Sequence, residues 1–154
     1  MRLLVFSDSH GTPYYFRQAL LMHKEADRII YLGDGERDLD FLTYEINGRP
    51  VTAVKGNCDF LSSLPENEML IIGGKRILCT HGYLEKVKYG EAYLISKAQS
   101  LKADAVLYGH THKQTSGYED GLYIMNPGSI AEGYYGMVDI IDSGIVTLTC
   151  RVER

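Results

Sequence analysis

Seven side chains of the kinds that bind metal ions follow closely on short apolar runs of the sequence. They are Asp8, His10, Asp34, Asn57, His81, His110 and His112. Two carboxylates, one amide oxygen and four imidazoles exceed what one ion needs, and the set lacks the thiolates of a structural zinc site. The set therefore predicts two divalent metal ions, an arrangement suited to in-line displacement at phosphorus.

The apolar runs before these residues are typical of buried strands. They are Leu3 to Phe6, Ile29 to Leu32, Val51 to Lys55, Ile77 to Cys79 and Ala105 to Tyr108. Because ligands of α/β proteins bind at the carboxyl ends of strands, we expect the polar residues to converge there. Asp8 with His10, and His110 with His112, are two positions apart, and in extended chain such residues point to one side.

A bland interpretation exists for each residue taken alone. A single histidine is more often structural than a ligand, and an aspartate after a strand is often a helix cap. However, four of the five histidines belong to this set, and only His23, in an expected first helix, stands apart. Coincidence explains the joint pattern poorly.

The remaining pattern predicts an α/β fold with two mixed β-sheets packed face to face and helices on both outer sides. The first half alternates strands with helix-length segments, which indicates βαβ units. Three hairpins are predicted at Gly73-Gly74, Asp120-Gly121 and Ser143-Gly144, and a helix is predicted over 89–101. No linker or repeat interrupts the chain, so we expect a single domain over residues 1–154.

Composition limits the classes of function. The chain has 154 residues and a formal net charge of -4, which argues against a broad nucleic-acid surface. No segment is long and apolar enough for a membrane span or a signal-peptide core, so we expect no membrane partner. The three cysteines, Cys58, Cys79 and Cys150, form no disulfide framework, which indicates a reducing, cytoplasmic location.

Five ordered blocks resemble the signature of the calcineurin-like metallophosphoesterase superfamily. They are Asp8-Ser9-His10, Gly33-Asp34, Gly56-Asn57-Cys58-Asp59, His81-Gly82 and Gly109-His110-Thr111-His112. The small size, together with Asn126-Pro127-Gly128-Ser129, is similar to the prokaryotic YfcE-like phosphodiesterase branch. The resemblance implies a four-layer fold and hydrolysis of a small phosphodiester by a hydroxide that bridges two metal ions.

The resemblance also implies a role for each ligand. Asp8, His10 and His112 would hold the first ion, and Asn57, His81 and His110 the second, with Asp34 as the bridge. Asp34, Asn57, His81 and His110 are the expected catalytic residues. Nitrogen and oxygen ligands admit manganese, iron, cobalt, nickel or zinc, and manganese is our expectation.

One position departs from the family pattern. Cys58 stands where many members have a histidine that helps the leaving group depart, and a small packed residue is the simplest interpretation of it. The alternatives to a phosphodiesterase are a phosphomonoesterase, a nucleotide pyrophosphatase and a non-catalytic scaffold, because the fold also resembles a membrane-trafficking subunit. A homodimer is the base-rate expectation for assembly.

Overall fold

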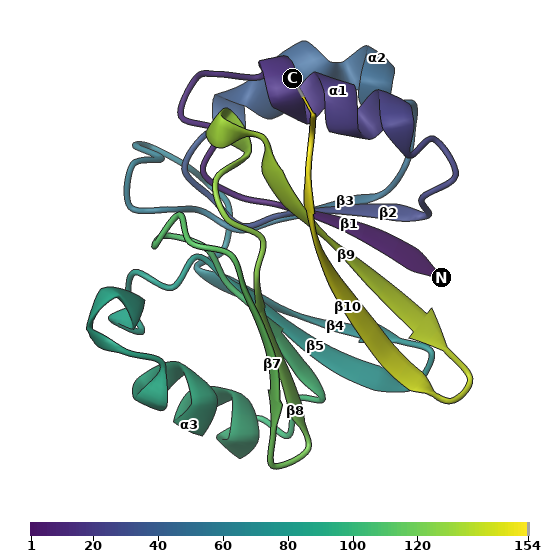
Figure 1. The fold of residues 1–154 in the computed structure, drawn as a ribbon. Coiled ribbons are helices and arrows are strands. Elements are labelled where there is room, and N and C mark those ends of the chain that lie inside the picture. Colours follow the sequence, from purple (N-terminus) through teal and green to yellow (C-terminus); the bar gives the residue numbers. More distant parts are fainter. Residues whose placement is uncertain (154) are drawn as a thin grey trace.

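The computed structural model describes residues 1–153, which form two five-stranded sheets with helices on their outer faces (Figure 1). The first sheet contains β1 (Arg2–Phe6), β2 (Arg28–Tyr31), β3 (Val51–Ala53), β9 (Tyr134–Ile141) and β10 (Gly144–Arg151). Its strand order is β10-β9-β1-β2-β3, in which β1, β2 and β3 are parallel and β9 is antiparallel to both of its neighbours, β1 and β10.

The second sheet has the strand order β4-β5-β6-β8-β7. Its strands are β4 (Asn67–Ile72), β5 (Lys75–Thr80), β6 (Ala105–Leu107), β7 (Thr115–Glu119) and β8 (Leu122–Asn126). Here β5, β6 and β8 are parallel, and the edge strands β4 and β7 are antiparallel to their neighbours. Each sheet therefore has a block of three parallel strands. The loops that follow these strands leave from the same edge of the sheet, so their side chains can lie close together.

Helices close the two outer faces, as Figure 1 shows. The helices α1 (Tyr14–Met22) and α2 (Thr43–Ile46) lie against the first sheet, and α3 (Ala92–Ser100) lies against the second. Short 3₁₀ segments cover Glu36–Leu42, Val87–Tyr89 and Ile130–Glu132. None of the helices in residues 1–153 is long and apolar enough to cross a membrane.

Strand β1 is buried on both faces, which explains its unbroken apolar run. Leu3 and Val5 point into the core between the two sheets, whereas Leu4 and Phe6 pack against the helices. Each is completely buried, and burying such a side chain stabilises the fold by roughly 1.5–3 kcal/mol. The strand that leads into Asp8 is thus held rigidly from both sides.

The predicted architecture and all three hairpins are confirmed, and the differences lie at element ends. Strand β3 stops at Ala53 because the Lys55 N–H donates to the Pro65 carbonyl instead of continuing the ladder. Helix α3 begins only at Ala92, since Gly90 has φ 129°, which is incompatible with a helix. His23 lies just beyond α1, as its C-cap, and bonds to the Tyr135 hydroxyl.

Candidate metal centre

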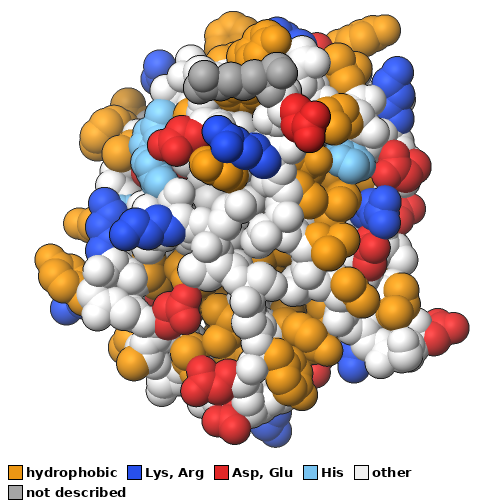
Figure 2. Space-filling model, in the orientation of Figure 1, with side chains coloured by type: hydrophobic (Ala, Val, Ile, Leu, Met, Phe, Trp, Pro, Cys, Tyr) orange, Lys and Arg blue, Asp and Glu red, His pale blue; other side chains and the backbone are white. Residues whose placement is uncertain are grey.

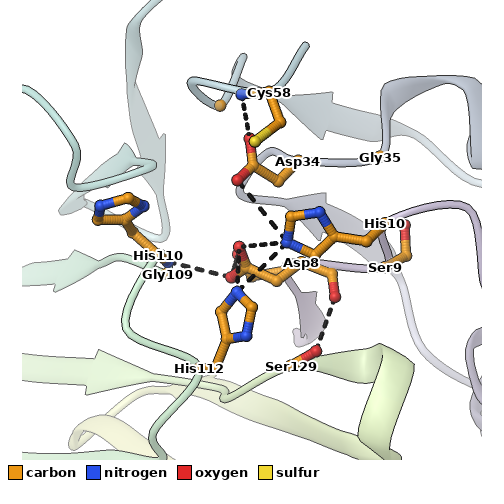
Figure 3. Close-up of polar contacts among 12 residues, drawn as sticks. Asp8, Ser9, His10, Asp34, Gly35, Cys58, Gly109, His110, His112 and Ser129 are labelled. Carbon is orange, nitrogen blue, oxygen red and sulfur yellow. Dashed lines mark hydrogen bonds and ion pairs between the residues drawn. The ribbon is translucent and has the colours of Figure 1, made fainter.

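The structure brings all seven predicted residues to one end of the two-sheet sandwich. Asp8 and His10 follow β1, Asp34 follows β2, Asn57 follows β3, His81 follows β5, and His110 and His112 follow β6. Figure 3 shows the two carboxylates in the middle, with His10 and His110 on opposite sides of them and His112 next to Asp8. The set therefore draws on the parallel block of both sheets.

One cluster consists of Asp8, His10 and His112, whose donor atoms lie within 4.8 Å of one another. The Nε2 atoms of His112 and His10 lie 3.3 Å and 3.6 Å from Oδ1 of Asp8. The same two nitrogens are 3.3 Å apart. These are the three residues expected at the first ion.

A second cluster consists of Asp34, His81 and His110, again within 4.8 Å. His81 Nε2 lies 3.2 Å from Oδ2 of Asp34 and 3.1 Å from Oδ1 of Asn57. Asp34 Oδ2 is also 3.8 Å from His10 Nε2, so this carboxylate lies between the two clusters. That position is the one expected of a bridging ligand.

The donor atoms fit a cation. Oδ1 of Asp8 is buried and receives no hydrogen bond from residues 1–153, although three imidazole nitrogens surround it. His81 Nδ1 lies 2.7 Å from the Leu32 carbonyl, to which it donates, so Nε2 of the neutral ring presents a lone pair to the cluster. Buried oxygen and nitrogen atoms that face one another with lone pairs, and with no hydrogen between them, destabilise the folded state unless a cation binds to them.

Both carboxylates are held in the charged form. Burial acts to raise the pKa of Asp34, but the neighbouring His81 side chain and a hydrogen bond from the Cys58 N–H outweigh it and lower the pKa to about 2. Burial likewise opposes ionisation of Asp8, whereas His112, His81 and the Ser7 hydroxyl lower its pKa. Two ionised carboxylates at the centre of the cluster supply negative charge that divalent ions can balance.

The two pairs of predicted ligands, Asp8 with His10 and His110 with His112, were expected to lie in extended chain, and the structure shows a different backbone. Asp8, His10, His110 and His112 are not extended, because all have φ between 46° and 69°, and Asp34 has φ 63°. These five account for half of the ten non-glycine residues with positive φ in the described chain. Ligand side chains thus leave tight left-handed turns, and a simple alternation along a strand does not explain their directions.

Two glycines are needed for these turns to pack. A Cβ added to Gly56 would lie 2.0 Å from Oδ1 of Asp34, and one added to Gly109 would lie 1.9 Å from the Ser7 hydroxyl oxygen. Any side chain at either position would collide with a ligand or with the residue that bonds to Asp8. The glycines next to the polar residues therefore serve close approach between loops.

Asp59 holds the two ligand loops of the first sheet, a role that sequence reasoning missed. Its Oδ2 accepts the N–H groups of Asp34 and Gly56, each at 2.8 Å, and its Oδ1 accepts those of Gly35 and Glu36. One carboxylate therefore fixes the backbone of the bridging residue and the loop leading to Asn57. The Gly-Asn-Cys-Asp block contained this residue, but its spacing gave no indication of the role.

Further side chains position Asp8, His10 and the 109–112 loop. Buried Asp38 accepts bonds from the Ser9 hydroxyl and the Gly11 N–H on either side of His10. Ser129 donates to the Asp8 carbonyl, and Asn126 donates to the Gly109 carbonyl. Asp38 had no sequence signal, because it lies in the 3₁₀ segment between β2 and α2 and not at a strand end.

Cys58 is not the packed residue that was expected. It is exposed, and its sulfur lies within 4.8 Å of donor atoms of His10 and Asp34. Burial and the neighbouring Asp34 carboxylate raise the pKa of the thiol, so it remains protonated at neutral pH. The group that faces the site at this position is therefore a neutral thiol.

Comparison with known proteins gives a consistent match. A model of the calcineurin-like phosphoesterase superfamily domain matches residues 1–142. The probable metallophosphoesterase YsnB of Bacillus subtilis is 35% identical over 131 residues, covering 84% of this chain and 75% of that protein. The phosphodiesterase YfcE of Escherichia coli is 27% identical over 169 residues, covering 90% and 88%.

Solved structures share the fold. A predicted phosphoesterase from Streptococcus pneumoniae superposes with a TM-score of 0.82 at 29% identity, covering 97% of this chain and 88% of that one. Vps29 of Entamoeba histolytica, crystallised with Zn²⁺, gives a TM-score of 0.75 at 22% identity, covering 98% and 99%. The second likeness concerns the fold alone.

Proposed function

The chain belongs to the calcineurin-like phosphoesterase superfamily, and from this premise we propose that it is a phosphodiesterase that uses two divalent metal ions. One observation supports the proposal above the others. The buried, unbonded Oδ1 of Asp8 faces three imidazoles, and Asp34 joins this cluster to a second set of nitrogen and oxygen donors. A small diester is the substrate, and manganese is the metal we expect.

The chain's own residues would bind and orient the ions and the phosphate. Asp8, His10 and His112 would hold one ion, Asn57, His81 and His110 the other, and Asp34 both. When bound, the ions supply a water of lowered pKa and neutralise charge on the phosphate oxygens. Asn57 and His110 also line a cavity beside the cluster, so a substrate there would lie next to this half of the site.

A metal-by-substrate screen tests the proposal. Purified protein, stripped with a chelator and then loaded separately with Mn²⁺, Co²⁺, Ni²⁺, Fe²⁺ or Zn²⁺, is assayed with bis(p-nitrophenyl) phosphate and p-nitrophenyl phosphate. We expect release of p-nitrophenol from the diester with Mn²⁺, at least about tenfold above the monoester, and none in the chelated sample. Diester hydrolysis that persists unchanged in metal-free protein would contradict the proposal.

Substrate preference follows from the thiol at Cys58. An alkyl monoester expels a basic alkoxide and gains about 10²–10⁴-fold from a general acid, whereas a nitrophenyl diester needs little proton donation. Cys58→His should therefore raise monoesterase activity relative to diesterase activity, measured as the ratio of kcat/KM for an alkyl phosphate monoester to kcat/KM for bis(p-nitrophenyl) phosphate. Cys58→Ala tests the thiol itself: loss of diesterase activity with metal content and fold intact would make the sulfur a participant.

A non-catalytic scaffold is the second candidate function, because the vacuolar protein sorting-associated protein 29 of Saccharomyces cerevisiae is 26% identical over 182 residues, covering 100% of this chain and 64% of that protein. Because a Vps29 structure was solved with Zn²⁺, metal content alone does not separate a scaffold from an enzyme. Turnover does separate them. Protein that binds two equivalents of metal and hydrolyses no phosphodiester in the screen would favour the scaffold.

A further inference from the structure

A cavity of about 790 Å³ lies beside the second metal cluster. Asn57 and His110 line it on the side of the metal centre, and the segment after β5 supplies the rest of its lining, including Tyr83, Lys88 and Tyr89. Its volume is within the range of roughly 300–1,000 Å³ that small-molecule sites occupy. A ligand in this cavity would lie directly against two of the predicted metal ligands.

The cavity wall is fixed by its own backbone. Lys86 N–H donates to the Tyr83 carbonyl, and Tyr89 N–H donates to the Lys86 carbonyl, with Lys86 itself at φ 54°. Buried Val87 fastens this turn to the hydrophobic cluster under α3. The backbone of this segment is therefore fixed, and it carries the side chains that line the cavity.

The wall offers flat apolar surface. Tyr83 is 54% exposed and its ring meets that of His110 edge-on, with centroids 5.5 Å apart. Leu84 and Tyr89 are 53% and 93% exposed on the same segment. Exposed tyrosine rings next to a phosphate site are suited to stacking on a heteroaromatic ring.

The wall also adds positive charge. Lys86 and Lys88 line the cavity together with Asn57 and His110, two of the predicted metal ligands. Lys55 and Lys97 are paired with glutamates, but no ion pair within residues 1–153 involves Lys86 or Lys88. In Figure 2 Lys or Arg side chains lie close to histidines at the left edge of the face shown.

A second cavity, of about 530 Å³, lies on the other side of Asp34 and is lined by His10, Cys58 and Phe60, among others. A phosphodiester has two arms, and the two cavities provide separate space for each. Of these two cavities, only the one at Lys86 and Lys88 combines tyrosine rings with ammonium groups that have no ion pair in residues 1–153. The two arms are therefore expected to differ in chemistry.

We propose that the cavity at Lys86 and Lys88 binds a nucleoside arm that bears a second phosphate, with the base against Tyr83, Leu84 and Tyr89. The second phosphate lies against the two ammonium groups. This inference rests on the phosphodiesterase function proposed above and names its substrate class. A compact nucleotide fits better than a nucleic-acid strand, because the chain is acidic overall, with a formal net charge of -4, and this cavity is lined by two lysines.

A matched pair of substrates tests this inference. Thymidine 5′-(p-nitrophenyl phosphate) and its 3′-phosphorylated form share the nucleoside, the scissile bond and the leaving group, and differ by one phosphate. The Mn²⁺-loaded enzyme should show about tenfold higher kcat/KM for the phosphorylated form, mainly through KM. Calorimetry should show that thymidine 3′,5′-bisphosphate binds about tenfold more tightly than thymidine 5′-phosphate.

Variants separate the lysine wall from general electrostatics. Lys88→Gln and Lys86→Gln should each bring the ratio of the two kcat/KM values toward one, and Lys24→Gln, at an exposed lysine beside a different cavity, should keep it. Equal kcat/KM for the pair, or a preference that survives Lys88→Gln together with Lys86→Gln, would overturn this inference alone. Failure to hydrolyse even bis(p-nitrophenyl) phosphate would overturn the phosphodiesterase proposal as well.

Discussion

Asp34→Asn is expected to abolish turnover, lowering kcat/KM for a diester by about 10³-fold or more. Oδ1 of Asp34 accepts the Cys58 N–H, so the amide oxygen would take that position. The new NH₂ group would then lie at the site of Oδ2, where His81 and His10 converge. A donor there repels a cation from the one position that both clusters share.

The fold should tolerate the change, because asparagine adopts the left-handed backbone that Asp34 uses. Asp120→Asn provides the matched control, since Asp120 is also left-handed, at φ 48°, but lies exposed in the β7–β8 turn. We expect the control to retain full activity and metal content. Near-normal Mn²⁺-dependent turnover by Asp34→Asn, with an unchanged melting temperature, would refute the two-ion arrangement.

Asp59→Asn should have the next largest effect, although Asp59 belongs to neither donor cluster. Each of its two oxygens accepts two backbone N–H groups. In either orientation of the asparagine side chain, the NH₂ group would therefore face two backbone N–H donors. Losing two charge-assisted bonds costs about 3 kcal/mol, which corresponds to a fall in Tm of roughly 5–10 °C. Displacement of Asp34 and Asn57 by about 1 Å should lower kcat/KM about 10²-fold.

The readouts for Asp59→Asn are thermal unfolding, bound metal and activity at a temperature where the variant is folded. Asp104→Asn is the control for stability alone, because Asp104 also accepts a backbone N–H, that of Arg76, but precedes β6 at the end away from the metal centre. We expect Asp104→Asn to lose stability and keep metal-dependent activity. If folded Asp59→Asn bound metal and turned over like the parent, its positioning role would be wrong.

The fold was predictable because local signals and burial agree along the chain. The run Leu3 to Phe6 is apolar at every position since β1 packs on both faces, and the turn dipeptides mark hairpins that the structure contains. The convergence of the seven candidate ligands was predictable, because each follows closely on a strand and the strands lead to the same end of the sandwich. Roles of Asp38 and Asp59 were not predictable, since their partners are backbone N–H groups, which have no sequence identity.

The left-handed residues at the metal centre have a consequence for how this sequence can change. Each non-glycine residue in that conformation costs roughly 1–2 kcal/mol relative to an ordinary one, and Asp8, His10, Asp34, His110 and His112 all adopt it. Replacing any of these five residues by glycine would relieve backbone strain and would also remove a side chain that can bind a metal ion. Selection for stability and selection for the donors thus act in opposite directions at the same codons, so a lineage freed from catalysis would be expected to lose its ligands first at these turns while keeping its sheets.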